Sequence, residues 1–178
     1  MKKKKSIYVI LTICISIIVI FGLFVLRQPT VQYAIAADAN FNLIFRYGVG
    51  AKNELNTSKG TYTKDMVTDP SITTNLSLPK EDLDIIYQKM LEINFFDYTD
   101  KFSVQAPLGE SICEQTPANS YYFKVEYDYK IKELSWDDSI CNKDAKADKL
   151  RELSSLIINI AESKEEYKKL PSPRGGYL

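Results

Sequence analysis

The stretch that decides the fold is residues 121–136, YYFKVEYDYKIKELSW. From 121 to 127, apolar side chains at odd positions alternate with polar ones, which indicates a β-strand with one buried face. Leu134 and Trp136 are apolar at even positions, so a turn or bulge must fall between about 128 and 133. We expect a tight hairpin with its tip near Asp128–Lys130. The expected partners are Phe123 with Leu134 and Tyr121 with Trp136.

Beyond this hairpin, the spacing of apolar residues predicts a helix that ends at about residue 163, or at 169 if the charged segment 165–169 continues it. Asn142 or Asp144 can cap its first turn, since a short polar side chain accepts hydrogen bonds from free backbone N–H groups. The helix presents one apolar stripe, made of Leu150, Leu153, Leu156, Ile157 and Ile160.

Residues 171–178, PSPRGGYL, carry no helical pattern and form an extended tail. Such a tail either frays or docks as an extended peptide, on a partner or on the sheet of its own chain. If it docks on a partner, we expect the contact to come from Arg174, Gly175, Gly176 and Tyr177.

On the N-terminal side of the hairpin, apolar residues at helical spacing predict a helix over about 79–93. Pro79 suits its start, and Glu81 and Asp82 suit the positive end of the helix dipole. Phe95-Phe96 should fill the core where the helix ends. Residues 97–120, with Pro107, Gly109 and Pro117, predict a long irregular loop.

The alternation over 41–47 predicts a further strand, and 51–60 is expected to be a polar loop. Residues 61–67 and 72–78 predict a hairpin whose turn is Asp69-Pro70-Ser71. Together these elements predict an α+β domain over 41–170, in which an antiparallel sheet carries two helices packed on one face.

A membrane anchor is predicted before this domain. Lys2–Lys5 precede 21 uncharged, mostly apolar residues, 6–26, which as a helix would span ~30 Å, the hydrocarbon thickness of a bilayer. The four lysines keep the N-terminus cytoplasmic, so we expect a signal-anchor over 1–26, a tether over 27–40 and an extracytoplasmic domain. The alternatives are secretion after cleavage near Ala36 and, less favoured, lipidation at Cys14.

Cys113 and Cys141 lie in the part of the chain expected outside the membrane, where disulfides are stable. Both flank the predicted hairpin. We favour a disulfide between them, which would enclose a loop of 29 residues; two free thiols are the alternative.

Composition excludes several classes of function. The chain has no histidine, which excludes histidine-based catalysis and histidine-ligated metals, and its 23 basic and 23 acidic residues do not suggest a nucleic-acid partner. No cofactor motif is present. Asp97 with Asp100, and Asp137 with Asp138, are acidic pairs, and nothing in the sequence favours either as a hydrolase site.

Residues 79–160 run as helix, Phe-Phe, loop, Tyr-x-Phe-x-Val strand, hairpin ending in tryptophan, and leucine-rich helix. This order resembles small membrane-anchored extracytoplasmic domains of unknown function in Gram-positive bacteria and, more remotely, emfourin-like inhibitors of thermolysin-type proteases. The resemblance covers under half of the chain and rests on core positions, so no inhibitory residue carries over. We therefore expect a non-enzymatic, membrane-tethered module that binds an extracytoplasmic protein. The alternatives are an accessory subunit of an envelope complex and, less favoured, a carboxylate-based envelope hydrolase.

Overall fold

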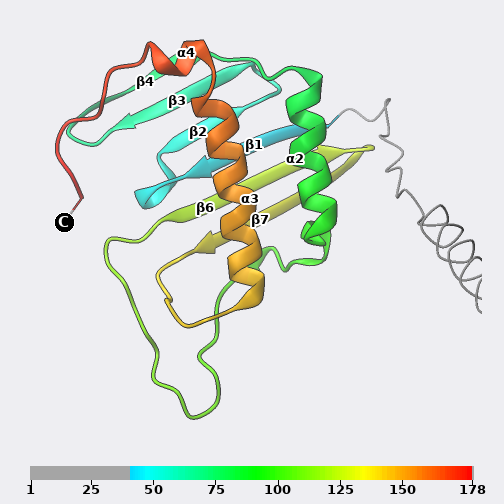
Figure 1. The fold of residues 1–178 in the computed structure, drawn as a ribbon, viewed down its shortest axis with the longest axis vertical. Helices are drawn as coiled ribbons and strands as arrows, with labels where there is room; N and C mark the ends of the chain where they lie inside the picture. The colour runs from blue at the N-terminus through cyan, green and yellow to red at the C-terminus, as the bar shows by residue number, and fades with distance from the viewer. Residues whose placement is uncertain (1–40, 178) are drawn as a thin grey trace, which may run out of the picture. The chain divides into compact units, whose positions relative to one another are not determined.

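A computed structural model describes residues 41–177, whose seven strands form one sheet in the order β4-β3-β2-β1-β6-β7-β5 (Figure 1). The strands are β1 (Asn42–Tyr47), β2 (Asn53–Asn56), β3 (Thr61–Met66), β4 (Asp69–Asn75), β5 (Lys101–Phe102), β6 (Ser120–Tyr127) and β7 (Lys130–Asp137). The helices are α2 (Lys80–Glu92), α3 (Ala145–Glu162) and α4 (Glu165–Lys168), with 3-10 turns η1 (Val49–Ala51) and η2 (Phe95–Asp97). The α+β class is thus confirmed, and α2 and α3 lie over the same face of the sheet (Figure 1).

The predicted hairpin is confirmed in its register. Strands β6 and β7 are antiparallel, and Phe123 pairs with Leu134 and Tyr121 with Trp136. The turn residues Asp128 and Tyr129 have φ angles of 46° and 59°. Two successive left-handed residues give a turn whose twist matches that of the strands, so the hairpin closes without a glycine.

The core lies between the helices and the sheet face that carries the odd positions of β6. Phe45, at the centre of β1, is fully buried and stacks near Tyr47, Tyr121 and Phe123. Helix α3 covers this face with a stripe whose fully buried side chains are Ala147, Leu150, Leu153 and Ile157. Its cap is Asp144, whose carboxylate accepts hydrogen bonds from the N–H groups of Lys146 and Ala147.

The prediction of an antiparallel sheet was wrong in one respect, because the sheet is mixed. Strand β5, inside the segment expected to be an irregular loop, runs parallel to β7, with Lys101 beside Ser135 and Phe102 beside Trp136. A two-residue strand that pairs with a distant segment leaves no periodic signal in the sequence.

Two further predictions near β3 were also wrong. The expected polar loop 51–60 contains strand β2, which joins β1 to β3. The β3–β4 turn lies at residues 67 and 68, so Asp69 and Pro70 belong to β4. Val67 takes a left-handed φ of 64°, which is unusual for a β-branched residue and was not indicated by the sequence.

Candidate functional site

The free edge of β7 is the first element of the candidate site. The N–H of Ser135 donates to the carbonyl of Asp100 at 2.8 Å, so the backbone of Ser135 faces away from β6. In an antiparallel ladder this direction repeats every second residue, so the N–H and C=O groups of Ile131 and Glu133 face the same way. Strand β5 pairs only with Ser135 and Trp136. Within residues 41–177, no strand covers the edge at Ile131 and Glu133.

An apolar groove lies beside this edge on the helix face of the sheet. It has a volume of about 340 Å³. Tyr87 of α2 stacks on Tyr127 of β6 with ring centroids 4.6 Å apart, and both rings line the groove. The apolar lining residues are Tyr87, Leu91, Phe96, Val125, Tyr127 and Ile131, and β7 also contributes Lys130 and Lys132. We define these eight residues as the hairpin groove.

A second hollow, of about 400 Å³, lies against the same edge, and its lining residues are polar apart from Ile131. Side chains alternate between the two faces of a strand, so those of Ile131, Glu133 and Ser135 lie on one face of β7 and that of Lys132 lies on the other. The lining residues of this outer hollow are Asp100, Lys101, Tyr122, Ile131, Glu133 and Ser135. The free edge thus has an apolar groove on one face and a polar hollow on the other.

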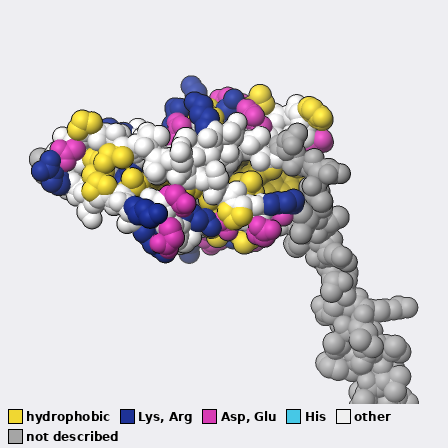
Figure 2. Space-filling model, turned by 90° about the horizontal axis from the view of Figure 1, so that it is seen from above, with side chains coloured by type: hydrophobic (Ala, Val, Ile, Leu, Met, Phe, Trp, Pro, Cys, Tyr) yellow, Lys and Arg dark blue, Asp and Glu magenta, His cyan; other side chains and the backbone are white. Residues whose placement is uncertain are grey.

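Large apolar side chains are unusually exposed around the hairpin. Ile131 is 63% exposed, Leu91 37%, and Tyr129 at the tip is fully exposed. The face seen in Figure 2 shows basic and acidic side chains interspersed, with hydrophobic side chains gathered in several small patches. Exposed apolar side chains next to unpaired backbone groups are features of surfaces that bind another chain.

The opposite edge of the sheet, β4, is built differently. Pro70 cannot donate a backbone hydrogen bond, and most of the other side chains of β4 are Thr, Ser, Asp or Asn. The chain's own tail already contacts this end, through a bridge between Val67 and Arg174. Of the two edges, β7 is the better acceptor for an added strand.

The predicted tail residues lie on their own chain in the structure. The Arg174 guanidinium forms two hydrogen bonds with the Asp69 carboxylate, at 2.6 and 2.7 Å. The Tyr177 hydroxyl donates to Asp65, and the Lys52 ammonium donates to Tyr177 at 3.1 Å. Gly175 has a φ of 83°, whereas Gly176 is simply exposed. Contact of these four residues with a partner stays a prediction.

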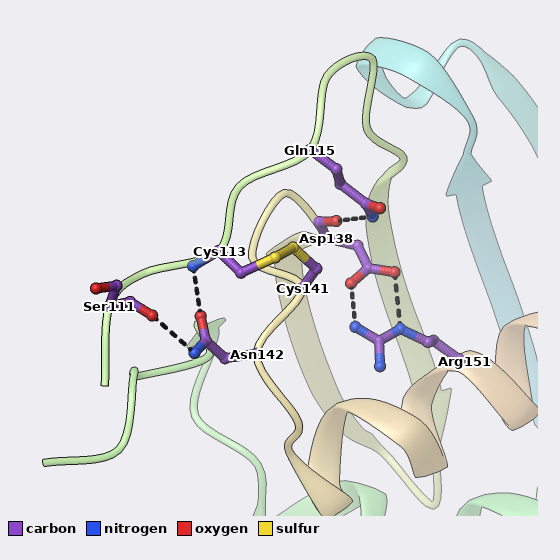
Figure 3. Close-up of a disulfide and its surroundings, with 7 residues drawn as sticks. All are labelled: Ser111, Cys113, Gln115, Asp138, Cys141, Asn142 and Arg151. Carbon is purple, nitrogen blue, oxygen red and sulfur yellow. Dashed lines mark hydrogen bonds and ion pairs between the residues drawn. A yellow bond between two sulfur atoms is a disulfide. The ribbon is translucent and has the colours of Figure 1, made fainter. Parts of the chain in front are cut away.

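Cys113 and Cys141 form the predicted disulfide (Figure 3). The segments around it are also hydrogen-bonded, because the N–H of Cys141 donates to the Cys113 carbonyl. The Asn142 side-chain amide accepts a hydrogen bond from the N–H of Cys113 and donates one to the Ser111 carbonyl. The disulfide therefore fastens the long loop before β6 to the segment after β7.

The acidic pairs are placed as follows. The Asp138 carboxylate is buried and accepts two hydrogen bonds from Arg151, at 2.6 and 3.0 Å (Figure 3). Asp137 is exposed. Asp100 forms an ion pair with Lys132 at 2.6 Å, and Asp97 is exposed. Among residues 41–177, no group of three or more cysteine or acidic side chains is placed to hold a metal ion.

Several tyrosines have strongly perturbed pKa values. The buried hydroxyls of Tyr47 and Tyr62 hydrogen-bond to each other. Burial, with a smaller contribution from the negative charge of Glu162, raises the pKa of Tyr47 to about 12. Burial also raises the pKa of Tyr62 and of Tyr167, whose hydroxyl donates to Glu162 at 2.6 Å. This cluster joins β1 and β3 to the helices and is structural.

The Tyr47–Tyr62 pair should make the domain sensitive to alkali. Because the pKa of Tyr47 is higher in the folded state than the unfolded value near 10, its contribution is present below pH 10 and is lost as the pH rises towards 12. A shift of this size corresponds to about 2–3 kcal/mol at the upper end. Urea unfolding between pH 9 and 11, followed by Trp136 fluorescence, measures the decline. Tyr47→Phe should make this decline less steep, although Tyr62 and Tyr167 still contribute to it. The exposed control Tyr129→Phe should leave the slope unchanged, and equal slopes for the two variants would contradict the assignment.

The predicted anchor, 6–26, and tether, 27–40, lie outside the described residues. Within 41–177, no helix has the length and apolar character needed to cross a membrane. Comparison with known proteins finds no matching family model, curated protein or solved structure.

Proposed function

We propose that this chain is a membrane-tethered, non-enzymatic module that binds another extracytoplasmic protein by adding an extended segment of it to the edge of β7. The observation that carries the proposal is that the outward-facing backbone N–H and C=O groups of Ile131 and Glu133 are not paired with another strand within residues 41–177. The hairpin groove lies on one face of the sheet beside these groups, and the outer hollow lies on the other face. An added strand satisfies the unpaired backbone groups, and its alternate side chains enter the two depressions.

The position of this edge suits a partner near the same membrane. Asn42, at the start of β1, pairs with Glu126, close to the tip of the hairpin. The free edge therefore lies at the end of the sheet where the tether joins the domain. The fourteen residues 27–40 reach at most ~50 Å when extended. A partner anchored in that membrane would be held within this range.

The test uses a photo-crosslinking amino acid in place of Ile131 in the full-length tagged chain, expressed in intact cells. We expect adducts to one extended segment of one protein, identified by mass spectrometry. Glu133→Pro should remove the adduct, because proline cannot donate from the outward-facing backbone position, while β7 keeps its ladder with β6.

Glu133→Ala is the matched control, since it removes the same side chain but keeps the N–H group. It should retain the adduct. An adduct that survives Glu133→Pro, or one that forms equally from the same crosslinker at Thr73 on β4, would rule out strand addition at β7. So would a complete lack of protein adducts from Ile131.

A further inference from the structure

The side chains around the free edge differ on its two faces, and they specify what kind of peptide fits. This inference rests on the strand addition proposed above. Of the eight residues that line the hairpin groove, six are apolar or aromatic, and the two charged ones are Lys130 and Lys132. These two lysines are two residues apart on one strand and so point to the same face.

The two lysines differ in whether their ammonium groups have partners in this chain. The Lys132 ammonium is engaged, because it donates to the Tyr98 carbonyl and to Asp100, both at 2.6 Å. Its ammonium is thus held by partners of its own chain, while its aliphatic stem lines the groove. Lys130 is exposed, and its ammonium forms no ion pair with any residue in 41–177. Lys130 is therefore the free cation at the rim of the groove.

We infer that the partner segment is an extended acidic–apolar peptide. Its residue opposite Lys132 carries a large apolar side chain that fills the aromatic groove, and its residue opposite Lys130 carries a carboxylate that pairs with the free ammonium. Peptide residues two apart lie on the same face, ~6.5–7 Å from each other, as Lys130 and Lys132 do. The spacing of acid and apolar side chains is therefore fixed at two residues.

The outer hollow specifies the residues between them. Apart from Ile131, its walls combine the carboxylates of Asp100 and Glu133 with Lys101 and the hydroxyl groups of Tyr122 and Ser135. Small polar side chains that can both donate and accept hydrogen bonds suit such a surface. The expected pattern is thus polar, acidic, polar, apolar, polar.

The test compares two fluorescein-labelled, end-blocked peptides, Thr-Glu-Thr-Phe-Thr-Glu-Thr and Thr-Lys-Thr-Phe-Thr-Lys-Thr. Both are symmetric about the phenylalanine, so each fits a parallel or an antiparallel strand. Fluorescence polarisation is measured with the full-length chain in a non-ionic detergent at low salt. We expect the glutamate peptide to bind about five-fold more tightly, the effect of an exposed ion pair. Lys130→Glu should reverse this preference, and 0.5 M salt should reduce it.

Lys149→Glu is the matched control, because it reverses the charge of an exposed lysine on α3, away from the groove. It should leave the preference for the glutamate peptide unchanged. Equal affinities for the two peptides, or no reversal with Lys130→Glu, overturn the acidic–apolar inference and leave strand addition standing. If neither peptide binds, or if binding persists in Glu133→Pro, strand addition itself is overturned.

Discussion

Replacing Phe45 by alanine should lower the free energy of unfolding by about 3–5 kcal/mol, the range for large-to-small changes at fully buried aromatic residues. Phe45 has no exposed surface and lies in β1, which joins the two halves of the sheet. Its ring is 4.8 Å from that of Phe123 and 5.2 Å from that of Tyr47. Removing it leaves a cavity bordered by both halves, which cannot close without shifting strands.

Urea denaturation followed by tryptophan fluorescence measures this loss. The chain has one tryptophan, Trp136, which is buried in the same core and so reports on the domain alone. Leu108→Ala is the control, because Leu108 is fully exposed and its loss should change stability by less than ~0.5 kcal/mol. A loss of under 1 kcal/mol for Phe45→Ala would contradict the packing described for β1.

Removing the disulfide should cost about 3–4 kcal/mol. The bond between Cys113 and Cys141 closes a loop of 29 residues that includes both strands of the hairpin. Without it the unfolded chain gains conformational freedom, and the chain-entropy model gives this magnitude for a loop of that length. The double variant Cys113→Ser, Cys141→Ser should show the loss in the same denaturation experiment, as should the unmodified chain under reducing conditions.

Cys14→Ser provides the control, since it removes the third thiol and keeps the bonded pair. Reductant should still destabilise this variant. If reductant left the unfolding transition of the unmodified chain unchanged, the bond would make no contribution to stability and this prediction would be wrong.

The elements that the sequence predicted well are those with long, regular alternation. The parity change between residues 127 and 134 required the β6–β7 turn, and the register followed from it. The apolar stripe of α3 was equally clear from the spacing of its leucine and isoleucine residues. Strand β2 was missed because its sequence, NELN, has one apolar residue and no β-branched one, so that its pairing with β1 and β3 overrides a weak local preference.

The site was less predictable than the fold. Tyr87, Phe96 and Tyr127 have the spacing of core residues, but in the structure they line a groove beside β7, whose edge is left free there by the short length of β5. That length depends on where residues 97–102 turn, which no local pattern reveals. The disulfide could be predicted because only two cysteines flank the hairpin. The contact of Arg174 with Asp69 joins residues 105 positions apart and has no signature in the sequence.

The order of the strands also dictates when the domain can assemble. Strand β1 is made early, but one of its two neighbours, β6, follows about 80 residues later. Closing so long a segment costs chain entropy before any contact compensates it, which slows folding relative to a sheet of successive hairpins. During synthesis, the β1–β4 half must wait with one side of β1 unpaired until β6 emerges. The nascent chain therefore leaves the backbone groups along one edge of β1 unpaired while about 80 further residues are made.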